Sequence, residues 1–516
     1  MMVRTSRQLL AFVTVVFALA VTAAPGGRQT RGADPSNHVV IITLDGFGGW
    51  ALDDPYLPVP ALRSLAGRGA VAKGMRSVNP TVTWPNHTSI VTGVTPAKHG
   101  VLFNGMLVRD PGVPPRVEPW RDKNEMVRVP TLYDVAHEAG MTTAQVDWVA
   151  ILNTPAITWE FAERPERPEA KPAIGREMVK AGTIAQADLD TFATRNIVWR
   201  DEVWTNAAVH ILREHRPNLL LFHLLALDST QHRYGPRTPA AMTAMAHLDS
   251  QVARIVRAIE ETGLMPRTTI FVLSDHGFKA VRRQILPNAA LMKAGLLKVE
   301  DGKITQTQAY VVPEGGSALV YVTVPDRAGD ILNRTRQALA GLEGLDKMVE
   351  PPDYAQYGLP LPSANQQMGA LFLTAKAGYA FAAGTGDTTA IDAPEGSLGA
   401  HGYVSTDPDL QALFIASGRG IKPGTTLETV NNVDVAPTAA KLLGLEMKNV
   451  DGRVLSDILD LSRPVGRAVE VIRPNQMMSR EKGPDRPVEA LGVDGCGVHV
   501  AAAHLDERLL AARGLV

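Results

Sequence analysis

The sequence predicts an α/β fold in which a mostly parallel sheet is flanked by helices on both faces. Three apolar runs, 38–45, 218–228 and 269–275, each end in an aspartate. Uninterrupted apolar runs of this kind are typical of strands buried on both faces. A long stretch at 239–262 carries an apolar stripe at helical spacing and leads directly into the third run. This strand, helix, strand order indicates βαβ units.

The remaining elements support the same alternation. Short helices are predicted at 60–67 and 131–137, and an amphipathic helix at 203–215 feeds the second run. A strand is predicted at 142–146. These elements place the first part of a catalytic α/β core at residues 36–283.

A different pattern begins at residue 284. Residues 284–398 combine alternating strands with Gly/Pro turns, which predicts an α+β insertion that forms a cap beside the site. The α/β pattern resumes at 412–417 and closes with a helix at 433–443, so the last part of the core is residues 399–460. No catalytic or binding role is predicted for the Arg-, Pro- and Glu-rich tail, 461–516.

The N-terminus and the composition limit localisation and partners. Arg4 and Arg7 precede an apolar stretch that is shorter than a bilayer span, so residues 1–24 are predicted to be a signal peptide. We therefore expect a secreted or periplasmic bacterial protein without a transmembrane anchor after cleavage. Cys496 is the single cysteine, so no intramolecular disulfide forms. The net charge of −1 favours no stable nucleic-acid complex. The oligomeric state is not specified.

The strand ends predict a metal site. Ligands in parallel sheets bind beyond the carboxyl ends of the strands, and Asp and His together suit zinc. Six ligands favour two ions over one, because two ions can clamp the attacking and leaving oxygens of a phosphoryl transfer. The six are Asp45, Asp228, His232, Asp275, His276 and His401.

Each of these residues also has a purely structural interpretation. An aspartate after a strand can cap a helix, the segment at 275–277 can be a simple turn, and His401 alone is unremarkable. His223 lies inside a strand run and is expected to be a packed core histidine, while His87 and His99 are expected to be structural hydrogen-bonding residues.

Thr83 is the candidate nucleophile. It lies at or just before the start of a helix that has Pro85 in its first turn. A helix N-terminus favours anions, and a hydroxyl bound to a metal there ionises more readily than in water. The alternative is that Thr83 is only an N-cap.

Six motifs occur in an order that resembles the type I phosphodiesterase/nucleotide pyrophosphatase family of the alkaline phosphatase superfamily. The resemblance extends from about Val39 to Leu445. The motifs are Leu44-Asp45-Gly46-Phe47, the run 83–93, His99-Gly100 with Asn104, Asp228-x-x-x-His232-x-x-Gly235-Pro236, Ser274-Asp275-His276-Gly277 and His401-Gly402-Tyr403. The resemblance implies an alkaline-phosphatase-like core and a hydrolase that acts on small phosphodiester or nucleotide substrates.

Roles follow from this resemblance. One zinc would be held by Asp228, His232 and His401, and the other by Asp45, Asp275 and His276 together with Thr83. Thr83 would form a phospho-threonine intermediate that activated water then hydrolyses. Asn104 would donate a hydrogen bond to a non-bridging phosphoryl oxygen.

The match has departures that concern the substrate. Trp84 stands where the family usually has a phenylalanine wall for base stacking; it could stack or pack in the core. Residues 147–150 replace a Trp-Pro-Gly-like segment, which leaves Trp159 as a candidate second wall.

Four rival functions are weighed against this one. A phosphomonoesterase would need a Ser-x-Lys-x-Arg segment near 147–152, which is apolar here. Phosphonoacetate hydrolase shares the threonine and the ligands. A sulfatase lacks its nucleophile motif. A non-catalytic secreted metal-binding protein is the non-enzyme alternative.

Overall fold

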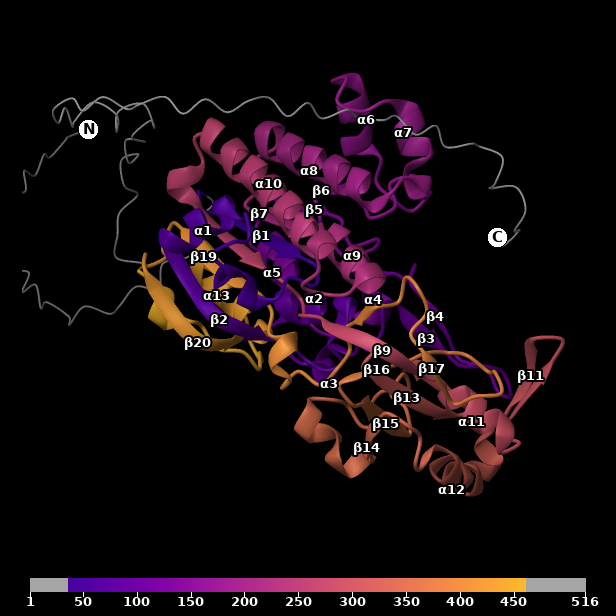
Figure 1. Ribbon diagram of the computed structural model, residues 1–516. Helices are drawn as coiled ribbons and strands as arrows, with labels where there is room; N and C mark the ends of the chain where they lie inside the picture. The colour runs from indigo at the N-terminus through magenta and orange to yellow at the C-terminus, as the bar shows by residue number, and fades with distance from the viewer. Residues whose placement is uncertain (1–35, 461–516) are drawn as a thin grey trace, which may run out of the picture. The chain divides into compact units, whose positions relative to one another are not determined.

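The computed structural model describes residues 36–460, and its centre is an eight-stranded sheet (Figure 1). The strands lie in the order β20-β2-β19-β8-β1-β7-β5-β6, and only β19 runs antiparallel to its neighbours. Their bounds are β1 His38–Leu44, β2 Gly69–Arg76, β5 Thr143–Val146, β6 Trp159–Phe161, β7 Leu219–Leu224, β8 Thr268–Leu273, β19 Phe414–Gly418 and β20 Thr425–Asn431. The predicted mostly parallel sheet is confirmed.

Alternate side chains of β1 belong to two separate cores, which explains its uninterrupted apolar run. Val40, Ile42 and Leu44 pack in one core, while Val39 and Ile41 pack in the other. Each such side chain contributes roughly 1.5–3 kcal/mol by its burial. The first core is covered by helices α1 (Pro60–Gly67), α8 (Ile197–Glu214) and α10 (Pro239–Glu261). The second is covered by α2 (Thr83–Thr92), α5 (Leu132–Glu138) and α13 (Val435–Leu443).

The sequence predicted that the second apolar run, 218–228, forms one strand, and this prediction is wrong. Strand β7 ends at Leu224, and helix α9 (Ala226–Tyr234) begins two residues later. The Asp201 carboxylate accepts hydrogen bonds from the backbone N–H groups of Leu225 and Ala226, both at 3.0 Å, which fixes the start of this helix. Asp228 therefore lies in the first turn of α9 and not at a strand end.

The insertion contains both helices and mostly antiparallel strands. Its four-stranded sheet, in the order β12 (Ala309–Pro313), β13 (Ser317–Val322), β15 (Leu371–Ala375) and β14 (Leu345–Val349), packs with α11 (Pro287–Lys293) and α12 (Ala328–Leu339) around a core of its own. Strand β9 (Lys279–Ile285) begins before residue 284 and pairs with β16, β17 and β18. The domain boundaries and the role as a cap stay predictions.

The other helices and strands lie between and beside these elements in the chain. They are α3 Pro96–His99, β3 Met106–Val108, β4 Arg116–Glu118, α4 Lys123–Met126, α6 Ala173–Lys180, α7 Gln186–Asp190, α11 Pro287–Lys293, β10 Leu297–Glu300, β11 Lys303–Thr307, β12 Ala309–Pro313, β13 Ser317–Val322, α12 Ala328–Leu339, β14 Leu345–Val349, β15 Leu371–Ala375, β16 Gly378–Phe381, β17 Ala390–Asp392 and β18 Gly399–Ala400.

Two predicted segments, the signal peptide at 1–24 and the tail at 461–516, lie outside the described residues. Within residues 36–460, no helix has the length and apolarity needed to cross a bilayer.

Candidate metal centre and active site

Three aspartates meet at one edge of the sheet. Asp45 follows β1 directly, Asp275 follows β8 after one serine, and Asp228 lies in the helical turn after β7. Strands β7, β1 and β8 are parallel neighbours, so their carboxyl ends share this edge.

Imidazoles lie beside these carboxylates at short distances. His276 Nε2 is 3.1 Å from Asp275 Oδ2 and 3.5 Å from Asp45 Oδ1. The Oδ1 atom of Asp228 is 3.4 Å from His232 Nε2 and 3.8 Å from His401 Nε2. All six residues suggested by the sequence therefore come together.

The geometry groups these ligands in a slightly different way from the family resemblance. Asp45, Asp275 and His276 form one compact set, as the resemblance implies. The second compact set is Asp228, His401 and again His276, and the His276 and His401 rings stack with centroids 3.9 Å apart. His276 thus lies between the two groups, while His232 approaches the second one through Asp228.

The polar atoms of this centre fit a cation. Four buried atoms have no hydrogen-bond partner among the described residues: Asp45 Oδ1, Asp228 Oδ1, Asp275 Oδ2 and His276 Nε2. Burial raises the pKa of Asp45 well above its ordinary value and that of Asp228 to about 6, with further contributions from neighbouring carboxylates. Burial also lowers the pKa of His276 to about 3, which keeps this imidazole neutral. Unpaired buried carboxylates and neutral imidazoles are the groups that a divalent metal satisfies.

The three histidines of the centre, His232, His276 and His401, are each oriented by a hydrogen bond to a backbone carbonyl. The Nδ1 atom of His232 is 3.1 Å from the Gly399 carbonyl, that of His276 is 3.2 Å from the Gly277 carbonyl, and that of His401 is 2.9 Å from the Thr81 carbonyl. A carbonyl only accepts, so each Nδ1 donates and each Nε2 keeps a free lone pair. Metal-binding histidines are held in this way in proteins.

Thr83 is the first residue of α2, and its hydroxyl is not a cap. Val82 occupies the N-cap position, and the helix has no side-chain cap hydrogen bond. The alternative that Thr83 serves as the N-cap is therefore wrong. The Thr83 carbonyl accepts from His87 Nδ1 at 2.9 Å, and that same nitrogen is 3.7 Å from Asp275 Oδ2, which links the helix start to the metal centre.

Asn104 lies next to the start of α2. Its Oδ1 accepts from the Trp84 backbone N–H at 2.9 Å, which leaves the Nδ2 donors available. The Asn104 side chain is exposed, whereas Thr83 is 7% exposed. The Asn104 amide is thus held against the first turn of α2, at the residue next to Thr83 in the chain.

The sequence predicted that His223 is a packed core histidine, but the residue also has polar partners. It is buried, but its Nε2 is 3.1 Å from Asp45 Oδ2, and its Nδ1 is 3.1 Å from the Asp147 carbonyl. Burial opposes the charged form of His223, but the carboxylates of Asp147 and Asp45 outweigh it and raise the pKa of this imidazole well above its usual value. His223 therefore orients Asp45 from behind the metal centre. The other two histidines are hydrogen-bonded as expected; His99 Nε2, for example, is 3.0 Å from Ser89 Oγ.

We expect His223→Gln to lower the affinity for metal by about 10- to 100-fold, because Asp45 loses the partner that orients it. The affinity is measured by competition with a chelator of known zinc affinity. His99→Gln is the matched control, since His99 is equally buried but contacts no residue of the centre. Equal metal affinity of the two variants would contradict the role of His223.

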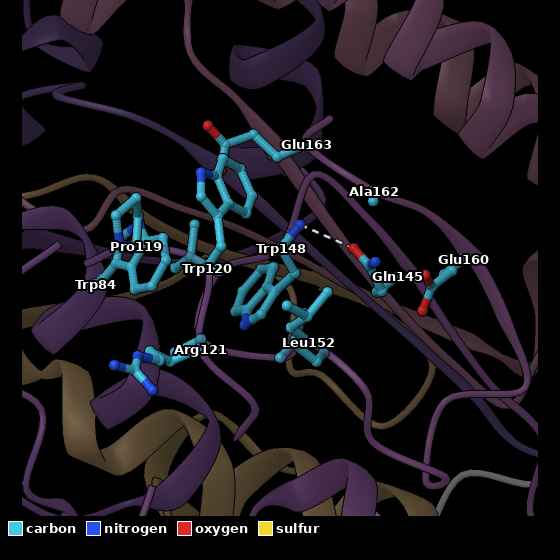
Figure 2. Close-up of a pocket in the computed structure, with 13 residues that line it drawn as sticks. Trp84, Pro119, Trp120, Arg121, Gln145, Trp148, Leu152, Glu160, Ala162 and Glu163 are labelled. Atoms are coloured by element: carbon cyan, nitrogen blue, oxygen red, sulfur yellow. Dashed lines mark hydrogen bonds between the residues drawn. The ribbon is translucent and has the colours of Figure 1, made fainter. Parts of the chain in front are cut away.

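A narrow pocket adjoins Trp84, and Figure 2 shows the rings of Trp84, Trp120 and Trp148 around it. Trp84 packs in a small core and also lines this pocket, so core packing is confirmed and stacking on a base stays a prediction. Trp159 is not among the lining residues, because its ring stacks on His215 instead, with centroids 4.7 Å apart. Trp120, which the sequence alone did not single out, lines the pocket together with Trp84 and Trp148.

A covered parallel sheet with an Asp/His centre at its strand ends and a free hydroxyl at a helix start defines a metallohydrolase of the phosphoryl-transfer type. The chain belongs to the type I phosphodiesterase / nucleotide pyrophosphatase family, whose sequence profile matches residues 39–404. This confirms the family and the hydrolase class that the motifs predicted.

Relatives from several organisms share about a fifth of their residues with this chain. An ectonucleotide pyrophosphatase/phosphodiesterase of Caenorhabditis elegans is 22% identical over 79% of this chain and 43% of its own length. An uncharacterized pyrophosphatase/phosphodiesterase of Schizosaccharomyces pombe is 22% identical over 86% of this chain and 84% of its own. Human ectonucleotide pyrophosphatase/phosphodiesterase family member 1 is 22% identical, and this chain spans only 40% of it.

Solved structures confirm the fold. Human ectonucleotide pyrophosphatase/phosphodiesterase 5 aligns with a TM-score of 0.62 at 17% identity, covering 82% of this chain and all of that one. An inactive threonine-to-alanine variant of the murine protein in complex with AMP aligns with a TM-score of 0.61, also at 17% identity, over 82% of this chain and all of that one. The predicted alkaline-phosphatase-like α/β class is thus confirmed.

Proposed function

We propose that this chain is a secreted two-zinc phosphodiesterase/nucleotide pyrophosphatase that hydrolyses phosphodiester or pyrophosphate bonds through a phospho-threonine at Thr83. One observation carries this proposal: four buried ligand atoms without a hydrogen bond lie together near a helix start whose hydroxyl serves no cap. Bound zinc would supply positive charge that favours the ionised hydroxyl and stabilises developing negative charge on phosphate.

The residues of the chain have separate tasks in this reaction. Asp45, Asp275 and His276 would hold one ion, while Asp228, His232 and His401 would hold the other. Thr83 Oγ1 attacks phosphorus in line with the leaving oxygen, and the bond from phosphorus to that oxygen breaks. Water then cleaves the phospho-threonine, which releases a phosphate monoester and restores the hydroxyl. Asn104 donates from Nδ2 to a non-bridging oxygen.

A nucleotide is the substrate class that the pocket favours. Three indoles line a cavity of about 40 Å³, which is too small for a base unless a wall moves. Trp120 is the least buried of the three and carries Arg167 over its face at 4.5 Å, so it is the wall we expect to open. The AMP complex of the murine relative supports a nucleotide here. Residues 147–152, where a phosphomonoesterase would need a Ser-x-Lys-x-Arg segment, contain neither lysine nor arginine, which favours a diester over a monoester.

The proposal is tested by comparing bis-(4-nitrophenyl) phosphate with 4-nitrophenyl phosphate under identical zinc conditions. We expect kcat/KM to be higher for the diester by about tenfold or more, a difference of about 1.4 kcal/mol in transition-state stabilisation. Faster hydrolysis of the monoester would overturn the diesterase assignment.

Trp120→Ala should raise KM for a nucleotide diester and leave KM for the small nitrophenyl diester unchanged. This difference separates the contribution of the Trp120 ring to base binding from the chemistry at phosphorus.

A further inference from the structure

A second cluster of side chains of the kinds that bind metals lies apart from the active site. Glu177 of α6 places its Oε2 atom 2.9 Å from His210 Nε2 and 2.7 Å from His215 Nε2. The three ligand atoms lie within 4.8 Å of one another. The side chains are 39%, 14% and 19% exposed, in the order Glu177, His210 and His215, so an ion from solvent can reach them.

The end of α8 brings the two histidines together. His210 belongs to the last turns of this helix, and His215 is its C-cap, whose N–H still bonds the Ile211 carbonyl at 2.9 Å. Arg216 then turns the chain with a φ of 49°. Residues five positions apart point in different directions on a regular helix. The two imidazoles nevertheless reach the same carboxylate oxygen here, with their rings tilted by 68°.

The cluster is remote from the catalytic centre. Helix α8 leads into the amino end of β7, whereas Asp228 follows its carboxyl end. The six residues of β7 span about 20 Å. No residue of the cluster contacts any of the six ligands of the centre among the described ion pairs and hydrogen bonds.

The donor set fits zinc or a similar borderline ion. Two imidazoles and one carboxylate with a fourth position left for water form a common zinc arrangement. Tetrahedral ligands at about 2.0–2.1 Å from the ion lie about 3.4 Å from each other. The Glu177 carboxylate oxygen would need to move away from the two imidazole nitrogens by only about 0.5–0.7 Å. Its exposed side chain permits that movement. The His215 ring is already held by its stack on Trp159.

We propose that Glu177, His210 and His215 form a third divalent-metal site that fastens α6 to the end of α8 (Figure 1). The site is independent of the proposed catalytic function. The competing explanation is that two histidines only hydrogen-bond to a glutamate at a helix C-terminus, where cationic side chains are favoured.

The two explanations differ in metal stoichiometry. The full chain and a His210→Gln/His215→Phe variant are dialysed against buffered zinc, and bound zinc is counted by mass spectrometry. The glutamine keeps a donor for Glu177, and the phenylalanine keeps the stack on Trp159. We expect the variant to hold one zinc fewer per chain. Equal zinc content would overturn the proposal.

Two further variants test the third site independently of the catalytic centre and of the folding of the double variant. In an Asp275→Asn background the catalytic centre loses a ligand, but the difference of one zinc must persist, so a fault in the catalytic proposal cannot imitate it. Should the double variant fail to fold, Glu177→Gln alone must weaken binding at this site by tenfold or more.

Fluorescence provides a separate readout. Copper(II) bound at His215 should quench the stacked Trp159 indole. This part of the quenching should disappear in both Trp159→Phe and His215→Phe; its persistence in His215→Phe would contradict the site.

Discussion

Replacing Thr83 with alanine should abolish phosphodiester hydrolysis while the metal stays bound. The hydroxyl is the first side chain of α2, stands 7% exposed and serves no cap, so its loss removes the nucleophile and little else. Loss of a covalent nucleophile commonly costs at least about 1,000-fold in kcat, or about 4 kcal/mol of activation free energy. The rate is measured with a nitrophenyl diester, and metal content is measured by mass spectrometry on the same sample.

Serine at this position is the matched control. Thr83→Ser keeps the hydroxyl at the start of α2 and should retain much of the activity, whereas Thr83→Val keeps the shape of threonine and should be as inactive as alanine. Wild-type turnover in the alanine variant would show that Thr83 is not the nucleophile. Loss of metal from it would show that the hydroxyl mainly binds the ion.

The sequence could predict the strands and helices whose burial follows a simple period. Strands β1 and β8 are apolar throughout because both faces are covered, and α10 carries a stripe of buried residues at helical spacing. The end of the strand in the run 218–228 was predicted wrongly because Ala226 and Leu227 are buried as fully as the strand before them. A continuous apolar run cannot show where a strand ends and a buried helical turn begins.

The sequence could predict the metal ligands but not the residues that surround them. Asp45 and Asp275 follow strands that must be parallel neighbours, so their meeting point follows from topology. His223 is the last residue but one of β7, and only the tertiary structure shows that it faces Asp45 and Asp147. Trp120 lies in a loop with no period, and Glu177 meets His215 only through the packing of α6 on α8. Contacts of this kind leave no signal in local sequence.

Removal of metal with a chelator should eliminate activity and also destabilise the fold in a pH-dependent manner. Without a cation, Asp45, Asp228 and Asp275 are buried together with unpaired oxygens. The pKa of Asp228 in the folded chain is about 6, compared with an ordinary value of 3.8, mainly because of burial. At about 1.4 kcal/mol per unit, this one group accounts for roughly 3 kcal/mol.

The sign of this effect follows from proton binding. Between pH 4 and pH 6 the folded metal-free chain holds more protons at Asp228 than the unfolded chain does, so its free energy of unfolding falls as the pH rises. The metal-loaded protein should lack the share of this decline that comes from the metal centre, because the bound cation favours the ionised carboxylates. Melting temperatures of both forms at pH 4.5 and pH 7.5 measure it, and Asp228→Asn is the control that should make the decline of the metal-free protein shallower. A metal-free protein that is as stable at pH 7.5 as at pH 4.5 would mean that these carboxylates are solvated or paired. In that case, the converging oxygens would not be the reason that the centre needs a metal.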